Sequence, residues 1–382
     1  MSSLTPHSWQ EIVFDQIVKD SAFGPRFPGT AYADDGNIAT LRTTDISADG
    51  NISYDTMPLA HLDEATFSNH FLKPGDLVIT RSGRIGTTAI FEGHNKLVLP
   101  GAFLIRFRLS KEANPRFFCY WFNSTLGQQR LLSVARGAAQ QNINITNVKT
   151  LRVPLPPLQG QQSIVSILCA YDDLIENNRR RIQLLEQAAR LLYKEWFVDL
   201  RFPGHEHTQI IDGLPEGWEK KPLETVAPLK YGKALKKDDR IPGPFQVYGS
   251  SGIVGTHSKA LVPGPTIIVG RKGNVGSVYW SPGDCHPIDT VYYMDSEHCS
   301  FFLYYALQQM TFINTDVAVP GLNRDLAHSR LMLVANQKIL RLFEETVSPL
   351  HRQMELLKRQ NAALAKARDL LLPKLMNGKF VV

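Results

Sequence analysis

The sequence contains an internal duplication, and this repetition constrains its fold more than any other feature of the sequence. Residues 72–86 and residues 261–276 both read as an apolar, β-rich stretch that enters a turn of the form Arg-x-Gly-x-x-Gly, with one residue of insertion between the copies. A Pro-x-x-Trp element precedes each copy, at residues 6–9 and 215–218, and a long helical pattern follows each copy. Because self-similarity of this kind indicates a repeated architecture, the sequence predicts the order globular part, helix, globular part, helix.

Two long segments carry the heptad spacing of helices that pair with another helix. In the first segment, apolar residues recur at alternating steps of four and three from Ile164 to Trp196, and Asn178 is a polar position that can fix register. We expect each helix to span about 35–40 residues, or roughly 50–60 Å, and the two helices to form an antiparallel pair. The alternative is that each helix packs on a separate core. The positions assigned to the pairing are Asn178, Leu185, Leu192, Leu357 and Leu364.

The second helical pattern is more polar than the first and contains a proline. Its series runs from Ile339 to Leu371 and includes three polar positions, Thr346, Gln353 and Gln360. Pro349 has no amide hydrogen to donate to the helix, so we expect the helix to kink or restart there.

The predicted fold class is α+β: two mixed α/β globular domains, joined and separated by two long antiparallel coiled-coil helices, in an internally duplicated chain. A proline and a glycine within residues 201–208 end the first helix and open a polar linker. Shorter patterns predict strands at residues 102–109 and 290–294, and helices at residues 116–127 and 301–310. The expected segments are a first domain at 1–157, a central helix at 158–203, a second domain at 204–333 and a C-terminal helix at 334–382.

Composition permits nucleic-acid binding and argues against several other classes of protein. The formal net charge of +6 is a mild positive excess, and 43% hydrophobic residues are enough to build packed cores. The four cysteines form no Cys-x-x-Cys pair, which favours a reducing compartment over a disulfide scaffold. The N-terminus lacks a signal-peptide pattern, and no apolar run approaches the roughly 18 residues of a membrane span. We therefore expect a cytoplasmic location and no membrane partner.

Signatures of catalysis and of cofactor binding are missing from the sequence. It contains no P-loop, no Gly-x-Ser-x-Gly elbow, no His-Glu-x-x-His helix and no Asn/Asp-Pro-Pro-aromatic run. Cys285, His286, His298 and Cys299 could supply a zinc tetrad by residue type. Their spacing matches no common ligand pattern, and two buried thiols beside incidental histidines are the simpler interpretation. We expect no catalytic residue, no metal and no cofactor in this chain.

The basic residues are the remaining candidates, and binding to DNA is the function that they suggest. Arg81, Arg84, Arg271 and Lys272 lie on the paired glycine turns, where a guanidinium can approach a phosphate closely. Residues 230–240 mix cations with an aromatic residue, as nucleic-acid surfaces often do, although a solvated loop is the alternative interpretation. The candidates in that segment are Lys233, Lys236, Lys237 and Arg240.

Taken together, these motifs resemble the specificity subunit of type I restriction–modification systems, over the whole chain. Besides the duplicated order, the most specific parts are residues 154–158, 194–204 and 368–378. Three further segments are similar to a common type of second recognition domain, namely residues 231–233, 247–252 and 267–273. The second copy lacks the Pro-Leu-Pro-Pro element of the first, so the final helix can enter at a different angle.

The resemblance implies two target-recognition domains that each read one half of a split, asymmetric site in double-stranded DNA, held apart by a spacer of paired helices. It also implies two methyltransferase subunits that dock on the helices and two ATP-driven restriction subunits. S-adenosylmethionine, ATP and Mg²⁺ would then belong to these partners. The alternatives are a self-contained DNA-modifying enzyme with unrecognised motifs and a coiled-coil adaptor that binds protein.

Residues shared by both domains cannot carry the difference between two half-sites. We therefore expect Arg81, Arg271 and the paired glycines to grip the DNA backbone or to hold the turn. Base reading should fall to segments that do not match between the copies, residues 32–55 in the first domain and residues 231–248 in the second.

Overall fold

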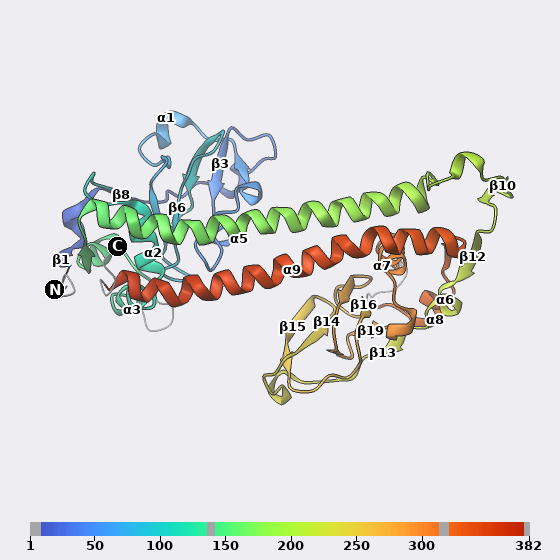
Figure 1. Cartoon of the computed structure of the whole chain (residues 1–382). Helices are drawn as coiled ribbons and strands as arrows, with labels where there is room; N and C mark the ends of the chain where they lie inside the picture. The colour runs from blue at the N-terminus through green and yellow to red at the C-terminus, as the bar shows by residue number, and fades with distance from the viewer. Residues whose placement is uncertain (1–8, 136–141, 313–320, 378–382) are drawn as a thin grey trace. The chain divides into compact units, whose positions relative to one another are not determined.

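The computed structural model of the chain describes residues 9–135, 142–312 and 321–377 (Figure 1). Pro6, which opens the first Pro-x-x-Trp element, and Gly378, which ends the last motif, lie outside these residues. The chain forms two compact units, one of Met1–Asn177 with Gln360–Val382 and the other of Asn178–Arg359. Each unit combines one globular domain with parts of both long helices.

Strand β5 (Leu77–Thr80) lies at the centre of the first domain. All of its residues are buried, as expected for a short run of aliphatic and β-branched side chains that is covered on both faces. Since side chains alternate along a strand, Leu77 and Ile79 pack in one core with the aromatic residues of α2 (Pro115–Asn123), whereas Val78 packs in a second core. β5 therefore separates a helical layer from a second sheet.

The first domain contains two main sheets. In one the order is β2-β8-β5-β6 with antiparallel neighbours, and in the other the order is β4-β3-β7 with β3 parallel to β7. A further antiparallel pair joins β1 to β9. The other helices are α1 (Glu64–Phe67), α3 (Thr125–Ser133) and α4 (Ile145–Lys149). The strands are β1 (Gln10–Val13), β2 (Val18–Phe23), β3 (Ile38–Leu41), β4 (Leu59–Ala60), β6 (Thr88–Ile90), β7 (Leu97–Pro100), β8 (Leu104–Leu109) and β9 (Arg152–Leu155).

The helix predicted at residues 116–127 is wrong as a single helix, because Ser124 divides it. The backbone of Ser124 is extended, and its hydroxyl oxygen accepts a hydrogen bond from the amide of Gly127 (3.2 Å) at the start of α3. Its own amide donates to the last turn of α2. Ser124 is thus both the C-cap of one helix and the N-cap of the next, a role that its short polar side chain favours.

The second domain repeats the first, strand for strand, in its two main sheets. Their orders are β13-β19-β16-β17 and β15-β14-β18, and β14 is parallel to β18 as β3 is to β7. β12 pairs with β20 as β1 pairs with β9. The duplication and the strands and helix expected at 102–109, 290–294 and 301–310 are confirmed. The elements are β10 (Ile210–Ile211), β11 (Leu214–Pro215), β12 (Glu219–Pro222), α6 (Leu223–Val226), β13 (Lys230–Tyr231), β14 (Phe245–Gly249), β15 (Gly252–His257), β16 (Thr266–Gly270), β17 (Val278–Ser281), β18 (Cys285–Pro287), β19 (Val291–Tyr293), α7 (Phe301–Gln309), α8 (Arg324–His328) and β20 (Leu331–Val334).

The two long helices have the lengths that the heptad patterns predict. α5 (Leu158–Tyr193) has 36 residues and α9 (Gln337–Met376) has 40. α9 continues through Pro349 without interruption, so the restart expected there is wrong. In the part of the chain that the structure describes, every helix is too short or too polar to traverse a lipid bilayer.

Within each unit, α5 and α9 contact each other and run antiparallel. In the first unit, the side-chain amide of Asn361 in α9 donates to the carbonyl of Ile175 in α5 (3.2 Å). In the second unit, the ring of Tyr193 at the end of α5 packs against that of Phe343 near the start of α9, with centroids 6.1 Å apart. Of the positions expected in the pairing, Asn178 and Leu357 are buried, and Leu185, Leu192 and Leu364 are partly buried.

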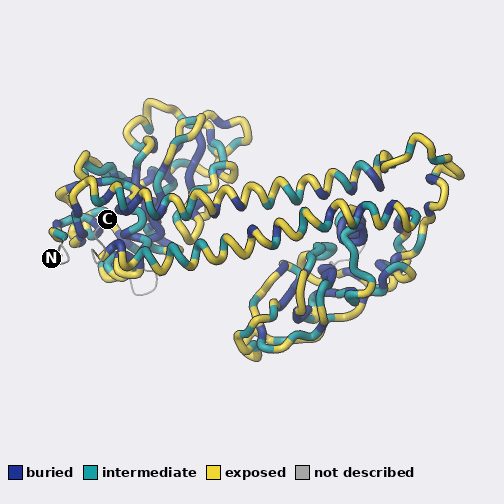
Figure 2. The backbone as a smooth tube through the Cα atoms, viewed as in Figure 1, coloured by how far each residue is buried: buried dark blue, intermediate teal, exposed yellow. Residues whose placement is uncertain are grey.

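The three polar positions predicted for the seam of α9 are wrong, because the inward-facing position lies one residue later in the sequence. Exposed and buried residues are interspersed along both helices (Figure 2), and Thr346, Gln353 and Gln360 all fall on the exposed side. Val347 and Met354 are buried in place of the first two. The buried residues at the start of the seam, Ile339, Phe343 and Val347, follow one another at steps of four. A helix of 3.6 residues per turn drifts relative to a strict heptad repeat, so the more apolar of two neighbouring residues can face inward.

The junction after α5 is held by aromatic packing. A π-helical turn, Lys194–Val198, follows the helix and buries two consecutive residues, Trp196 and Phe197. Phe202, at the start of the expected linker, is also buried, and its ring packs 4.8 Å from that of Trp218. The first part of the linker is therefore anchored to the second domain's core.

Candidate nucleic-acid interface

The paired arginines occupy equivalent positions in the two domains. Arg81 directly follows β5, and its amide donates to the carbonyl of Phe103 (2.9 Å). Arg271 directly follows β16, and its amide donates to the carbonyl of Thr290 (2.9 Å). The sequence prediction that these residues are counterparts is thus supported by their main-chain bonding.

The glycines of both turns adopt a backbone conformation that other residues rarely adopt. Gly83 and Gly86 have φ angles of 74° and 82°, and Gly273 and Gly276 have φ angles of 78° and 77°. Such left-handed angles carry little strain only for glycine. The glycines therefore hold the shape of the turn, as expected, and Arg84 and Lys272 project from it as exposed cations.

Each paired arginine lies over an aromatic ring at the end of an edge strand of its sheet. The Cζ atom of Arg81 is 4.7 Å from the ring centroid of Phe23, the last residue of β2. The Cζ atom of Arg271 is 5.2 Å from the ring centroid of Tyr231, the last residue of β13. Cation–π attraction can hold each guanidinium in place without neutralising its charge.

A glycine follows each of these aromatic residues and allows close backbone approach. A Cβ atom on Gly24 would lie 2.0 Å from the carbonyl oxygen of Gly101, and one on Gly232 would lie 2.1 Å from that of Ile288. Phe23 and Gly24 were missed as a candidate site by the sequence reasoning. The available signal was an aromatic-Gly dipeptide upstream of both Arg-x-Gly-x-x-Gly turns.

The charge of both paired guanidiniums is uncompensated within the described part of the chain. Among the described residues, no carboxylate lies within ion-pair distance of Arg81 or Arg271, and Nη1 of Arg271 donates to the backbone carbonyl of Asp289 (3.2 Å). The Nε atom of Arg81 is enclosed and has no hydrogen-bond partner among the described residues. A cation that is held in position but not neutralised is well suited to an anionic ligand.

The basic segment of the second domain divides into two kinds of residue. Lys233, Lys236 and Lys237 are exposed. Arg240 instead donates from Nη1 to the carbonyl of Val254 (2.6 Å) and from Nη2 to that of Leu235 (3.4 Å). Arg240 thus ties its loop to β15, which makes it a positioning residue for the three lysines.

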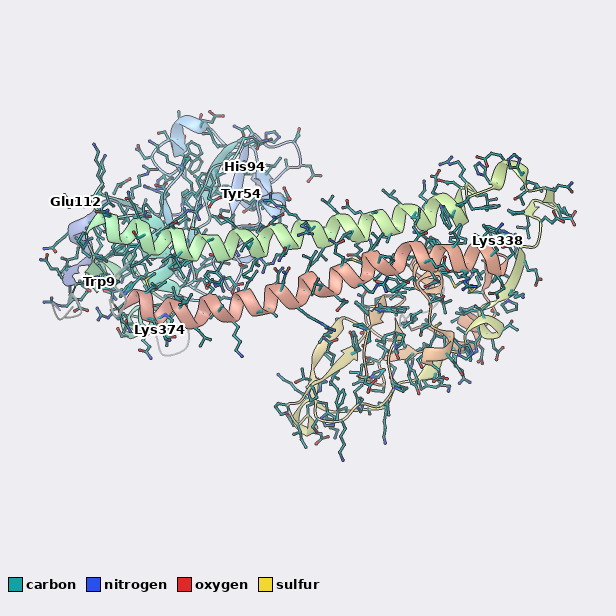
Figure 3. The ribbon with its side chains drawn as sticks, viewed as in Figure 1. Trp9, Tyr54, His94, Glu112, Lys338 and Lys374 are labelled. Atoms are coloured by element: carbon teal, nitrogen blue, oxygen red, sulfur yellow. The ribbon has the colours of Figure 1, made fainter. Side chains whose placement is uncertain are left out.

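The expected base-reading segments are only partly accessible. Within residues 32–55, strand β3 is wholly buried. Tyr54 is also fixed: its hydroxyl oxygen accepts a hydrogen bond from the amide of Glu92 (3.0 Å), and burial raises its pKa. Its ring stacks on His94, with which it is labelled in Figure 3. The accessible parts of the segment are its connecting loops.

The two domains differ most between the third strand and the strand that leads to the arginine turn. In the first domain this stretch includes β4, α1 and two short helical turns, whereas in the second it includes β15. Within residues 231–248, Val247 and Tyr248 on β14 are buried. Sequence divergence therefore lies in connections that extend from a common frame.

The four residues considered for zinc are not assembled into a site. Cys285 is buried in an apolar cluster, and burial raises the pKa of its thiol to about 11. Cys299 belongs to a different core. Within the described residues, the one group with metal-ligand geometry excludes both cysteines and consists of Asp295, Glu297 and His298.

A family model described as the type I restriction modification DNA specificity domain matches residues 8–187 and 215–364. The chain belongs to this family. Its two matched segments correspond to the two repeats, and the specificity-subunit resemblance inferred from the motifs is confirmed. Specificity subunits recognise DNA and do not catalyse a reaction, so the prediction of a non-catalytic DNA-recognition subunit is confirmed as well.

Known specificity subunits match this chain over most of its length. The chain is 24% identical to the type I restriction enzyme MjaIX specificity subunit of Methanocaldococcus jannaschii, over 70% of this chain and 69% of that protein. It is 23% identical to the HindI specificity subunit of Haemophilus influenzae, over 76% and 79% of the two chains. The crystal structure of a type I S subunit from M. genitalium has the same fold, with a TM-score of 0.60 at 19% identity and 98% coverage of both chains.

Proposed function

We propose that this specificity subunit reads a split, asymmetric DNA site, with one half-site for each globular domain. The observation that carries the proposal is a duplicated frame with divergent connections: the arginine turns match, and the loops beside them do not. Matching cations suit the backbone, which is the same in both half-sites, and divergent loops suit bases, which differ.

In this proposal the shared frame supplies affinity. Arg81, Arg84, Arg271 and Lys272 contact phosphates from the glycine turns, and counterion release makes that part of the binding salt-dependent. Lys233, Lys236 and Lys237 read base edges or nearby phosphates from the loop that Arg240 positions. In this proposal the recognition domains span residues 1–157 and 204–333, and the spacer helices span residues 158–203 and 334–382.

The long helices act as a spacer with a coiled-coil seam. Asn178, Leu185, Leu192, Leu357 and Leu364 provide the pairing side, and buried Asn178 can fix the register of the two helices. A spacer of roughly fixed length would set the distance between half-sites.

The outer faces of the helices serve as docking surfaces for two methyltransferase subunits. Leu184 and Leu191 are 64% and 66% exposed and lie seven residues apart, hence on one face of α5. Exposed apolar side chains in such a row favour a protein partner. Two restriction subunits join the assembly, and S-adenosylmethionine, ATP and Mg²⁺ are bound by these partners.

Methylation sequencing tests the proposal. The chain is expressed with its methyltransferase subunit in a host that lacks adenine methylation, and N6-methyladenine is mapped with and without the chain. We expect a split motif, with two different halves at a constant spacing, only when the chain is present. A continuous motif, or the same motif without the chain, would contradict the proposal.

A further inference from the structure

Tyr231 in the second domain holds two guanidiniums. The Cζ atom of Arg271 lies 5.2 Å from the centroid of its ring, and that of Arg324, the first residue of α8, lies 5.1 Å from the same centroid. Tyr231 is 49% exposed. Two cations from separate elements therefore converge on one accessible aromatic side chain.

Main-chain bonds fix both arginines in this arrangement. The amide of Leu322 donates to the carbonyl of Arg271 (2.8 Å), which holds the segment leading to α8 against the glycine turn. The side chain of Asn323 then caps α8 by accepting from the amides of Asp325 (2.8 Å) and Leu326 (3.1 Å). Arg324 is thus placed beside the ring by the fold.

Acids of the described residues do not balance the charges of the pair. Within the described part of the chain, the carboxylate nearest to Arg324 is that of Asp325, 3.8 Å from its Nε atom, and its side chain is 87% exposed. Arg271 has no acidic partner there. Like charges repel at short range, so an anion bound between or beside the two guanidiniums would relieve the repulsion.

Among the described residues of the first domain, Arg81 is the one guanidinium over the corresponding ring. Phe23 stands in place of Tyr231 and contacts Arg81. The residue after the capping asparagine of α4 is Ile145, at the position that Arg324 occupies in α8, and Ile145 packs against the domain core. Within the described residues, the paired guanidiniums occur in the second repeat, although the frame around them is shared by both.

We propose that Arg271 and Arg324, held by Tyr231, form a phosphate-binding pair that grips the DNA backbone at one half-site only. This inference rests on the proposed function and adds a residue, Arg324, and a difference in electrostatic contribution between the two half-sites. Arginine forks match phosphate oxygens in geometry, and the shared ring brings both forks to one phosphate or to two neighbouring phosphates.

Neutral backbone linkages provide the test. The complex of this subunit with its methyltransferase subunits is bound to a duplex carrying the split motif, in which single phosphates are replaced by methylphosphonates. We expect the wild-type complex to lose about tenfold in affinity at one linkage, or at two adjacent linkages, assigned to this pair. The Arg324→Ala complex, which keeps Arg271, should lose less affinity at that linkage than the wild-type complex and should show a salt slope smaller by about one.

Conservative variants separate binding from folding. Arg324→Lys keeps the charge and should retain the salt slope, and Tyr231→Phe keeps the ring and should resemble the wild type. If Arg324→Ala lowers the melting temperature but leaves both the linkage profile and the salt slope unchanged, the pair is structural and the inference is overturned. If the wild-type complex shows no preference for a split motif, the proposed function itself fails.

Discussion

The two repeats share a fold but fasten their domain helices to the long helices with different chemistry. In the first unit, the hydroxyl of Tyr120 in α2 donates to the carboxylate of Asp172 in α5 (2.5 Å), and Arg368 in α9 donates to the same carboxylate (2.6 Å). In the second unit, Tyr305 in α7 is hydrogen-bonded to His351 in α9 (2.8 Å). Asp172 and His351 stand at equal distances from the starts of their helices.

The first contact depends on charge, and the second depends on a neutral ring. Burial and the hydrogen bond to Asp172 raise the pKa of Tyr120. Burial acts to lower the pKa of Arg368, but hydrogen bonds to Asp172 and Asp369 outweigh it and raise that pKa. Burial lowers the pKa of His351 to about 4, and its ring stacks on Phe301 with centroids 3.9 Å apart. Duplication thus preserved the place of the contact but not its chemistry.

The largest expected difference between the units concerns pH. The folded-state pKa of His351 is depressed to about 4, so the unfolded chain binds the proton more readily. The stabilisation is fully present above about pH 6.5 and is lost as pH falls toward 4, by up to about 3 kcal/mol. His351→Gln can still accept from Tyr305 and should remove this component. Urea denaturation at several pH values, with hydrogen exchange on α7 as the local readout, measures it.

An unchanged pH dependence in His351→Gln would assign the effect to another group. Hydrogen exchange on α2 serves as the internal control, because the corresponding contact of the first unit contains no histidine.

The contact in the first unit should break when its shared acceptor is removed. Asp172→Ala leaves Tyr120 and Arg368 without that partner, and since both side chains of the ion pair are partly exposed, we expect a loss of about 2 kcal/mol. Urea denaturation measures the change. Asp173→Ala removes an exposed neighbouring carboxylate and should leave stability nearly unchanged; equal losses in both variants would contradict a specific role for Asp172.

The shared arginine turns should contribute to affinity without selecting sequence. Arg271→Ala is expected to weaken binding to all duplexes by about tenfold and to lower the salt slope. Fluorescence anisotropy at several salt concentrations measures both quantities. Arg341→Ala, which removes an exposed cation of α9, is the control. Loss confined to one half-site, with the salt slope unchanged, would make Arg271 a base-reading residue.

The smallest expected effect is a change in sequence selectivity that comes from the divergent loop of the second domain. Lys236→Ala should relax selectivity at one half-site by a few-fold, about 1 kcal/mol, because base contacts and not the frame carry the discrimination. Competition binding with duplexes altered in either half measures it. Lys220→Ala removes an exposed lysine on β12, outside the loop, and should not change selectivity.

Repetition made most of the fold predictable from the sequence. It gave the domain order, the long helices and the arginine turns, because glycines with left-handed backbone angles are visible as residue types. Phe23 was not visible as a site residue, since its contact with Arg81 spans a long divergent stretch. Arg240 counted as a basic residue, but its bonding to carbonyls depends on a loop closure that composition cannot reveal.

Prediction from local sequence preferences failed where two structural roles, or two neighbouring residues, compete for one position. Ser124 suits a helix surface and a cap equally well, and tertiary contacts select the cap. In α9, Gln353 and Met354 compete for the seam, and the burial of apolar surface favours Met354.

The π-helical turn after α5 makes the direction of the following chain depend on the number of residues in that turn. Its wider turn lets Trp196 and Phe197 point into the same core, which consecutive residues of a regular α-helix cannot do as well. Deleting one residue from Lys194–Val198 would restore the regular pitch, expose one of the rings and swing the following backbone about the helix axis. The junction therefore tolerates changes of its surface side chains better than changes of its length.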